Sequence, residues 1–268
     1  MSKFPKFSLL LLIATLLFIF LGDLLYLVSP YELNKNSLLL SPSFEHPFGT
    51  DRLGRDLFAR VMEGGKVSII IGVLSALIAS FIGLIIGITA GFFKGIIDKS
   101  FVIIIDLFLT FPTFFLLLAL VSYIDASILV LIFVISITGW MSVARLIRSE
   151  AFGISEQPFI KILKIAKVNK FKIIIKYFAP LLAPIFLVSF TFGVGGAILT
   201  ESGLSFLGLG VMPPQMSLGL LLSEGKEIID IAPWVSFFPG LFIFLITFSL
   251  INISDYLQNK INSKEGVK

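Results

Sequence analysis

Long apolar runs separated by short polar segments dominate the chain. A helix needs about 20 predominantly apolar residues to cross a bilayer. Six runs approach that length, at residues 7–28, 67–93, 101–124, 127–144, 181–200 and 234–253. The fourth run is short, and Pro184 and several glycines interrupt the fifth. The pattern predicts an all-α polytopic membrane protein with six transmembrane helices.

The first apolar run needs separate attention because Lys3 and Lys6 precede it, as basic residues precede a signal peptide. The run continues to Val28, which is long enough for a membrane span. No small-x-small cleavage site follows it. We therefore expect a retained first helix.

Composition supports a membrane protein and excludes several kinds of chemistry. Hydrophobic residues make up 57% and charged residues 14% of the 268 positions, and the mean hydropathy is +1.03. A soluble domain has about 25% charged residues. The chain lacks Cys and has one His, His46, so we expect no metal site and no Cys nucleophile. No arrangement of catalytic side chains stands out, and we expect no enzyme activity.

The distribution of basic residues predicts the orientation. Segments 1–6, 94–100, 145–180 and 254–268 hold 15 of the 21 Lys and Arg residues. Cytoplasmic loops are enriched in these residues. We therefore expect both termini in the cytoplasm, and the net charge of +4 reflects orientation rather than nucleic-acid binding.

A stripe of small residues follows one face of the second span. Such stripes let membrane helices approach closely, so the second span is expected inside the bundle or at a subunit interface. Chance is the alternative, because Gly is common in membrane helices. The stripe comprises Gly72, Ala76, Ser80, Gly83, Gly87 and Gly91.

Asp106 lies within the third span, ahead of Pro112. A carboxylate at that depth usually faces a cavity or a partner. It is either a relay group or, as we favour, a structural partner of a Lys or Arg on the cytoplasmic side. Pro112 is expected to kink the helix. Asp23 and Glu201 lie near span ends, where we expect them to reach headgroup water. So few buried charges argue against a proton-driven carrier.

The segment 145–180 contains a short amphipathic helix pattern. Lysines recur every three residues at Lys161, Lys164, Lys167 and Lys170, and an apolar set comprises Phe159, Ile160, Leu163 and Ala166. Such a helix docks into a groove of a partner protein or lies on anionic lipid. The spacing does not decide between these two roles.

Two long motifs carry a family resemblance. Residues 46–56 read HPFGTDRLGRD, and residues 197–211 read AILTESGLSFLGLGV. They resemble the HPxGTDxxGRD and E-x-x-LSFLGLG signatures of the dipeptide/oligopeptide/nickel ABC-transporter permeases. Residues 106–112 are similar to the D-x-x-x-x-FP stretch of that family. The resemblance covers about residues 8–257 and is to the second, C-subunit type of the two paired permeases.

The resemblance implies the fold of a type I ABC importer permease in the cell (inner) membrane. Such a permease forms the pathway with a second permease, and an extracytoplasmic binding protein delivers the substrate. Two separate ATPase subunits use ATP and Mg²⁺, and this chain, which has no P-loop motif, is expected to bind no cofactor. The implied division is an N-terminal helix and extracytoplasmic segment at 1–66, a permease domain at 67–257 and a tail at 258–268.

The family carries an E-A-A…G motif on a coupling helix that inserts into the ATPase. Here the matching positions are Lys161, Ile162, Leu163 and Lys167, so the motif has changed in charge and size. A co-adapted ATPase and weakened coupling are the two explanations, and we favour the first. The expected coupling segment is Phe159, Ile160, Lys161, Ile162, Leu163, Ala166 and Lys167.

The motif at 46–56 supplies the remaining candidate residues: His46, Pro47, Gly49, Thr50, Asp51, Gly54, Arg55 and Asp56. Its charged residues either contact the binding protein and take part in gating, or form a solvated surface with weak local ion pairs. His46 is expected in a turn. The segment 208–233 is expected to be an irregular, partly re-entrant outside loop with an acidic edge at Glu224, Glu227 and Asp230.

The leading hypothesis is a permease subunit of an importer for dipeptides or oligopeptides. Import of nickel or another small solute is an alternative, as is a permease-like membrane partner with altered or lost ATPase coupling. An ion-coupled carrier is disfavoured.

Overall fold

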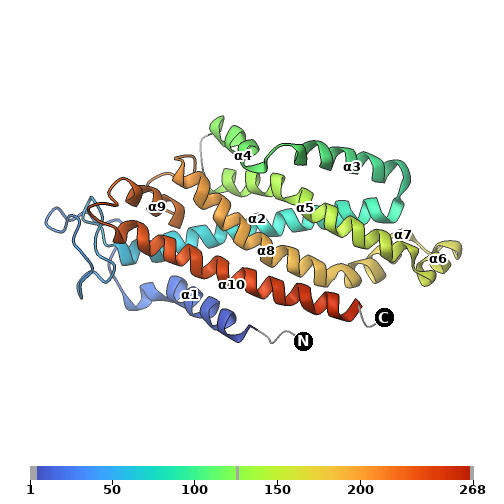
Figure 1. Ribbon diagram of the computed structural model, residues 1–268, viewed down its shortest axis with the longest axis horizontal. Helices are drawn as coiled ribbons and strands as arrows, with labels where there is room; N and C mark the ends of the chain where they lie inside the picture. Colours follow the sequence, from blue (N-terminus) through green and yellow to red (C-terminus); the bar gives the residue numbers. More distant parts are fainter. Residues whose placement is uncertain (1–4, 125–126, 266–268) are drawn as a thin grey trace.

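A computed structural model gives the structure of the chain and describes residues 5–124 and 127–265 (Figure 1). The described residues form helices and one isolated β-bridge between Thr50 and Asp56, so the all-α prediction is confirmed. The elements are α1 (Lys6–Leu25), α2 (Leu57–Phe93), α3 (Gly95–Thr110), α4 (Thr113–Ser122), α5 (Ile128–Glu156), α6 (Pro158–Ile165), α7 (Lys170–Ile173), the π-helical turn η1 (Ile174–Phe178), α8 (Ala179–Phe206), α9 (Leu218–Lys226) and α10 (Trp234–Glu265).

Five helical stretches are long and apolar enough to cross a membrane: α1, α2, α5, the continuous stretch Lys170–Phe206, and α10. The pair α3 and α4 forms a sixth span if it is counted as one, and it is bent by 81°. The span predicted over 101–124 is therefore a bent pair of helices, and the kink expected at Pro112 is a complete break. Phe111 has extended backbone angles and Pro112 cannot donate a backbone hydrogen bond, so the helix breaks there completely.

Four spans extend beyond their apolar runs: α2, α5, the stretch Lys170–Phe206, and α10, which continues to Glu265. Helix α2 begins at Leu57, because the Asp56 side chain accepts a hydrogen bond from the amide of Ala59 and caps the helix. The predicted boundary at residues 66 and 67 falls inside this helix, and the domain division stays a prediction. Helix α5 continues to Glu156 because Ile147 and Ala151 remain buried past the apolar run. Residues 170–178 continue into α8, which keeps Pro184 in its interior.

Helix α2 lies at the centre of the bundle, with its most extensive contacts to α5 and then to α8. Helix α10 packs against α8, α9 and α1. Figure 1 shows α3 and α4 on one side of the bundle and α1 on the opposite side. The last turn of α1 and the first turn of α10 both lie at the end that carries the loop 26–56, whereas α6 projects from the other end. These two ends are called the loop end and the α6 end.

The segment 208–233 is not wholly irregular, because it contains α9. Ser217 caps this helix by accepting a hydrogen bond from the amide of Leu220. Leu218 and Leu221 are buried in the cluster that also contains residues of α1, α2, α8 and α10. The hydrophobic contacts of α9 therefore hold it against the bundle at the loop end (Figure 1).

Candidate functional site

The loop 46–56 depends on two glycines with positive φ. Gly49 has φ +78° and Gly54 has φ +73°. A Cβ at Gly54 would lie 1.9 Å from the carbonyl oxygen of Asn34, and one at Gly49 would lie 2.6 Å from the carbonyl oxygen of Leu40. Both positions therefore require Gly for conformation and for space.

Thr50 and Asp56 join this loop to the helices. The amide of Leu40 donates to the Thr50 hydroxyl at 2.8 Å, and the Trp234 indole donates to the Thr50 carbonyl at 3.2 Å. Asp56 accepts hydrogen bonds from the Tyr26 hydroxyl at 2.7 Å and caps α2, and His46 Nδ1 lies 2.7 Å from its carboxylate. Burial, and then the hydrogen bond to Asp56, raise the pKa of the Tyr26 phenol.

His46 also forms the predicted turn, since its carbonyl accepts hydrogen bonds from the amides of Ser43 and Gly49. Pro47 follows it within the turn. Among the described residues, no group of three His, Asp or Glu side chains is placed to hold a metal ion.

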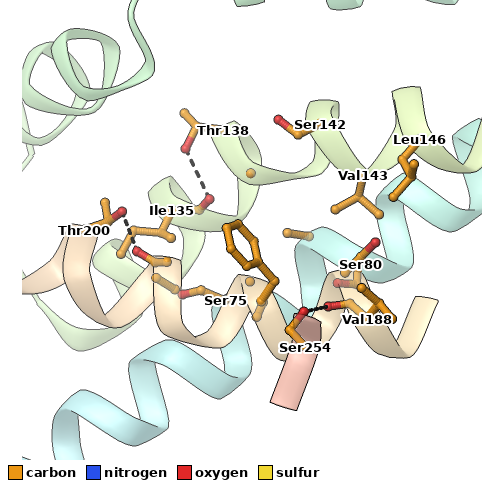
Figure 2. A pocket seen from close by; sticks show the side chains of 18 of the residues that line it. Ser75, Ser80, Ile135, Thr138, Ser142, Val143, Leu146, Val188, Thr200 and Ser254 are labelled. Carbon is orange, nitrogen blue, oxygen red and sulfur yellow. Dashed lines mark hydrogen bonds between the residues drawn. The ribbon is translucent and has the colours of Figure 1, made fainter. Parts of the chain in front are cut away.

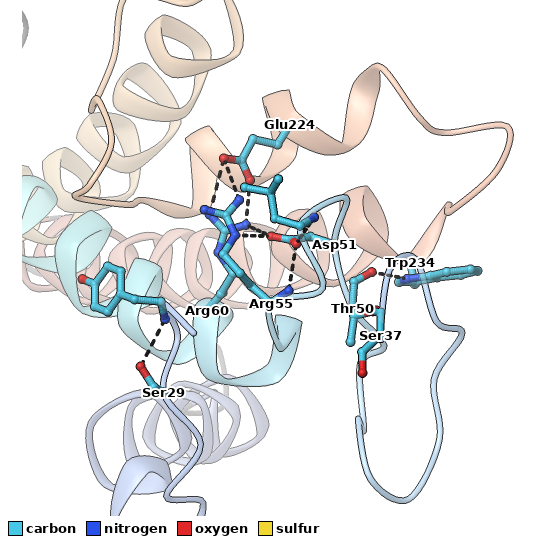
Figure 3. A network of polar contacts seen from close by, with 10 residues as sticks. Ser29, Ser37, Thr50, Asp51, Arg55, Arg60, Glu224 and Trp234 are labelled. Atoms are coloured by element: carbon cyan, nitrogen blue, oxygen red, sulfur yellow. Dashed lines mark hydrogen bonds and ion pairs between the residues drawn. The ribbon is translucent and has the colours of Figure 1, made fainter. Parts of the chain in front are cut away.

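Asp51 is the centre of a buried network of charges (Figure 3). Its carboxylate accepts hydrogen bonds from Arg60 and from Arg55 Nε, the latter at 2.6 Å. Arg60 Nη1 also donates to Glu224 of α9 at 2.7 Å. Asp51, Asp56 and Arg60 are all buried, so the alternative of a solvated surface segment does not hold for these three residues. The network instead links the loop to α2 and α9.

Figure 3 also shows that Arg55 and Arg60 approach the same carboxylate of Glu224. Arg55 Nη2 lies 3.5 Å from Glu224 Oε1. A neighbouring pair on the surface joins Arg52 to Glu227 at 2.8 Å. Two of the three acidic residues expected to form an outside edge therefore pair with arginines of the loop.

Glu201 of α8 lies in a second buried polar site. Its carboxylate accepts hydrogen bonds from Ser205 at 2.6 Å and from Ser68 of α2 at 3.1 Å. The Ser68 hydroxyl in turn accepts from the amide of Leu218 at 3.0 Å. Glu201 is completely buried, so the expectation that it reaches headgroup water was wrong. This chain of hydrogen bonds joins α2, α8 and the first turn of α9.

The small residues of α2 line its contacts with α5 and α8. A Cβ at Gly83 would meet Val143 at 2.7 Å, and one at Gly87 would meet Ile147 at 2.7 Å. One at Gly91 would meet Ala151 at 2.6 Å, and one at Gly72 would meet Ile198 of α8 at 2.5 Å. The remaining members of the stripe, Ala76 and Ser80, are buried and line the cavity described next.

A cavity of about 450 Å³ opens between α2, α4, α5, α8 and α10 (Figure 2). Small and hydroxyl side chains line much of it, and Figure 2 shows hydroxyl groups on α2, α5, α8 and α10 around it. Asp255 is the one charged residue among the described residues of the lining. The hydroxyl-bearing residues are Ser75, Ser80, Thr113, Thr138, Ser142, Ser189, Thr200 and Ser254.

Two ion pairs connect α3 to α5. Asp106 pairs with Arg145, and both side chains are largely exposed. Asp98 pairs with Arg148, whose Nη2 lies 2.7 Å from Asp98 Oδ2. Asp106 thus has an arginine partner, the kind of partner favoured for it, and it is outside the cavity lining.

The expected coupling segment lies on α6 and in the turn after it. Ile160 is fully buried and Leu163 half-buried in a cluster with residues of α2, α5 and α8. Phe159, Ile162 and Ala166 are exposed. Lys161 forms an ion pair with Glu156 at 2.8 Å. Lys167 has φ +52°, the conformation that favours Gly, at the position where the family has its Gly.

The sequence gives little sign of two of these sites. Glu201 and Ser205 are four residues apart and therefore share a helix face, but no spacing connects them to Ser68. The ion pair between Arg60 and Glu224 joins residues 164 positions apart. Such contacts depend on how the helices pack, which a single sequence does not specify.

Comparison with known proteins identifies relatives over most of the chain. Residues 83–263 match the family of binding-protein-dependent transport system inner membrane components. The oligopeptide transport system permease protein OppC of Mycobacterium tuberculosis H37Rv is 35% identical over 80% of this chain and 75% of its own length. The dipeptide transport system permease protein DppC of Alkalihalophilus pseudofirmus is 33% identical over 98% and 86%. The nickel transport system permease protein NikC of Escherichia coli K12 is 30% identical over 87% and 84%.

Proposed function

Because the chain belongs to the family of binding-protein-dependent transport system inner membrane components, we propose that it forms half of the translocation pathway of an ATP-driven importer of dipeptides or oligopeptides. The chain is a multi-pass inner-membrane permease subunit of the peptide and nickel group, and it is not an enzyme.

The cavity between α2, α5 and α8 is the observation that supports a role in the pathway. Apart from Thr113 of α4, its hydroxyl groups lie within helices that are long and apolar enough to span the membrane. Thr138 and Thr200 donate to a carbonyl of their own helix, and Ser75 and Ser254 donate to a carbonyl of a neighbouring helix. Each of these hydroxyl oxygens is therefore still available as an acceptor. Such a surface offers hydrogen bonds to a solute without a fixed charge. A second permease would complete the wall, and these small residues would allow the helices to tilt during alternating access.

The lining, in which Asp255 is the one charged side chain among the described residues, favours a peptide as the substrate. A peptide backbone carries one donor and one acceptor per residue, and hydroxyl groups pair with either. A divalent cation is instead bound by carboxylate, imidazole or thiolate groups, and the described lining carries only Asp255 of these types. Relatives whose names specify oligopeptides and dipeptides support the same substrate class.

The remaining parts of the proposed transporter are other chains. We infer a second permease, two ABC ATPase subunits that bind ATP and Mg²⁺, and an extracytoplasmic binding protein, all assembled at the lipid bilayer. This chain would bind no cofactor. The α6 segment would transmit closure of the ATPases to the spans, since it projects from the bundle at the end opposite the loop 46–56 (Figure 1).

Reconstitution tests this proposal. Proteoliposomes would contain this chain, the second permease, the ATPases and the binding protein. We expect ATP-dependent uptake of a radiolabelled tripeptide and no uptake of ⁶³Ni²⁺. Nickel uptake without peptide uptake would overturn the substrate class. If the assembled complex moves neither solute and its ATPase activity does not respond to the loaded binding protein, the importer assignment fails.

A further inference from the structure

Glu201 of α8 lies at the centre of a buried cluster of hydroxyl groups. Its neighbours Ser68, Ser205 and Ser217 are buried with it. Each carboxyl oxygen has one serine partner, since Oε1 lies 2.6 Å from Ser205 Oγ and Oε2 lies 3.1 Å from Ser68 Oγ. Within the described part of the chain, Glu201 forms no ion pair. An ionised carboxylate in such a place is strongly unfavourable unless a positive charge compensates it.

The charged side chains of the helices around α8 are engaged elsewhere. On α2, Glu63 pairs with Lys66, and Arg60 pairs with Glu224 of α9. Lys226 of α9 has its Nζ 4.5 Å from the centre of an aromatic ring at the end of α8. None of these described side chains compensates a charge on Glu201. The described charged side chains of α5 and α10 lie toward the α6 end: Arg145, Arg148, Glu150, Glu156, Asp255 and Lys260.

A protonated carboxyl group would complete the hydrogen bonds of the cluster. The Leu218 amide donates to Ser68 Oγ at 3.0 Å, and the Ser68 hydroxyl donates to Glu201 Oε2. A carboxylic acid both accepts and donates, so a proton on Oε1 donates to Ser205 Oγ. The Ser205 hydroxyl then faces Ser217 Oγ at 3.5 Å. Each group accepts from the one before it and donates to the one after it, which an ionised carboxylate does not allow.

A bound metal ion is the other possible source of positive charge, and the distances disfavour it. Oxygen ligands lie about 2.0–2.6 Å from a Mg²⁺ or Ca²⁺ ion, which sets neighbouring ligands farther apart than a hydrogen bond does. Glu201 Oε1 and Ser205 Oγ, at 2.6 Å, are instead at the short end of the range for a direct O–H···O hydrogen bond.

We propose that Glu201 is a proton-binding site, in which the packed position of α9 holds the side chain as a neutral carboxylic acid. Ser217 caps α9 and Leu218 begins it, so displacement of α9 from α8 removes two members of the cluster and admits water. A glutamate in water is ionised at neutral pH, and the proton would then leave to the solvent. A rise in pH therefore favours the displaced position of α9. This inference goes beyond the proposed function and does not depend on the substrate.

Infrared spectroscopy of the purified protein in detergent tests for the proton directly. At about pH 8, ordinary glutamates are ionised. We expect the wild type to show the carbonyl band of a protonated carboxylic acid, and Glu201→Gln to lack it. Gln keeps one donor and one acceptor at this position, so the variant should fold, which monodispersity checks. Glu63→Gln is the matched control, because Glu63 is a glutamate of the neighbouring helix that pairs with Lys66, and it should keep the band.

Hydrogen exchange tests the connection to α9. Because displacement of α9 would release one proton, protection of the Leu218 amide should fall by about ten-fold per pH unit between about pH 6 and pH 8. The rates are first corrected for the intrinsic pH dependence of exchange. In Glu201→Gln the corrected protection should not change with pH, since an amide side chain does not titrate in this range.

Three results would overturn the inference. Absence of the carbonyl band from the wild type, or its persistence in Glu201→Gln, would show that Glu201 does not hold the proton. Protection of the Leu218 amide that is independent of pH in the wild type would show that α9 does not control the site. A change in that protection at constant pH, when sodium is replaced by N-methylglucamine, would identify a metal ion as the compensating charge.

Discussion

A glycine with a positive φ angle resists substitution through its backbone conformation, and some such glycines are also crowded by neighbouring atoms. Gly54 and Gly208 have similar angles, of +73° and +81°. Their surroundings differ. A Cβ at Gly54 would collide with the Asn34 carbonyl, whereas a Cβ at Gly208 would have no described atom within 4 Å apart from those of Gly208 and its two chain neighbours. Alanine substitutions at these two glycines therefore separate the cost of backbone strain from the cost of a steric collision.

We predict that Gly208→Ala destabilises the protein by about 1–2 kcal/mol, the cost of a left-handed conformation for an L-residue. Gly54→Ala should be clearly more harmful, because the loop must also move away from Asn34. The apparent melting temperature in detergent, followed by size-exclusion chromatography, measures both. Equal shifts for the two variants would show that the Asn34 contact adds nothing.

Glu201 shows how one buried residue can hold a neighbouring helix. Removal of its carboxylate leaves the buried hydroxyls of Ser68 and Ser205 without this acceptor, at a cost of about 1–3 kcal/mol. We predict that Glu201→Ala speeds hydrogen exchange in the first turn of α9, since the Leu218 amide donates to Ser68.

Thr200→Ala is the matched control, because its hydroxyl donates only to Gly196 of its own helix. This variant should leave exchange in α9 unchanged. Similar exchange rates at residues 218–221 in Glu201→Ala and in the wild type would mean that α9 is held by its apolar contacts and the Arg60–Glu224 pair without help from Glu201.

At the scale of whole elements, the close approach of α2 and α5 depends on glycines that have no room for a methyl group. A Cβ at Gly87 would lie 2.7 Å from Ile147 and 2.9 Å from the Ala144 carbonyl oxygen. The carbonyl belongs to the helix backbone, so a side-chain rotation cannot relieve the contact. Overpacking of this kind costs about 1–3 kcal/mol.

We predict that Gly87→Ala lowers the resistance of the protein to unfolding by SDS, whereas Gly153→Ala does not. Gly153 is a helical glycine of α5, and a Cβ there would have no described atom within 4 Å apart from its chain neighbours and the nearby backbone of its own helix. Ala there gains about 1 kcal/mol in helix propensity. A Gly87→Ala protein as resistant as the wild type would indicate that the helices separate at no cost.

The elements also show which features of the fold follow from the sequence. Apolar length predicts the spans because a bilayer imposes a minimum length on any helix that crosses it. Pro112 marks the position of the break between α3 and α4, since its missing N–H is visible in the sequence. The bend of 81° is set by packing and could not be predicted.

Helix α9 and the charge network could not be predicted for a related reason. Segment 208–233 contains many Gly and Pro residues, and its helix is stabilised by contacts with residues distant in sequence, such as Arg60 with Glu224. For the loop 46–56, the motif identifies the residues but not their burial. The charges therefore left a solvated surface open as one of two alternatives, although Asp51 and Arg60 are inside the protein.

At the scale of the whole molecule, polar groups concentrate at three levels along the spans. The charged network of Asp51, Arg60 and Glu224 lies at the loop end (Figure 3), and the ion pairs of Glu156 lie beside α6 at the other end. The cavity lies between them, within the bundle (Figure 2). Ion pairs thus join neighbouring elements at each end of the bundle. The described cavity lining, in contrast, carries only Asp255 as a charged residue. A solute crossing this half of the pathway would meet mainly hydroxyl groups and apolar surface.

Two glycines allow this role to be tested without disturbing the packing. Gly196 of α8 lines the cavity, and Gly153 of α5 does not. A Cβ at either position would have no described atom within 4 Å apart from its chain neighbours and the nearby backbone of its own helix. We predict that Gly196→Phe fills the cavity and lowers ATP-dependent peptide uptake about ten-fold or more, while the ATPase stays bound, since a blocked passage affects transport without affecting assembly. Gly153→Phe should transport as the wild type does. Uptake by Gly196→Phe at the wild-type rate would place the pathway elsewhere in the complex, because a phenylalanine ring at this site cannot leave the cavity open.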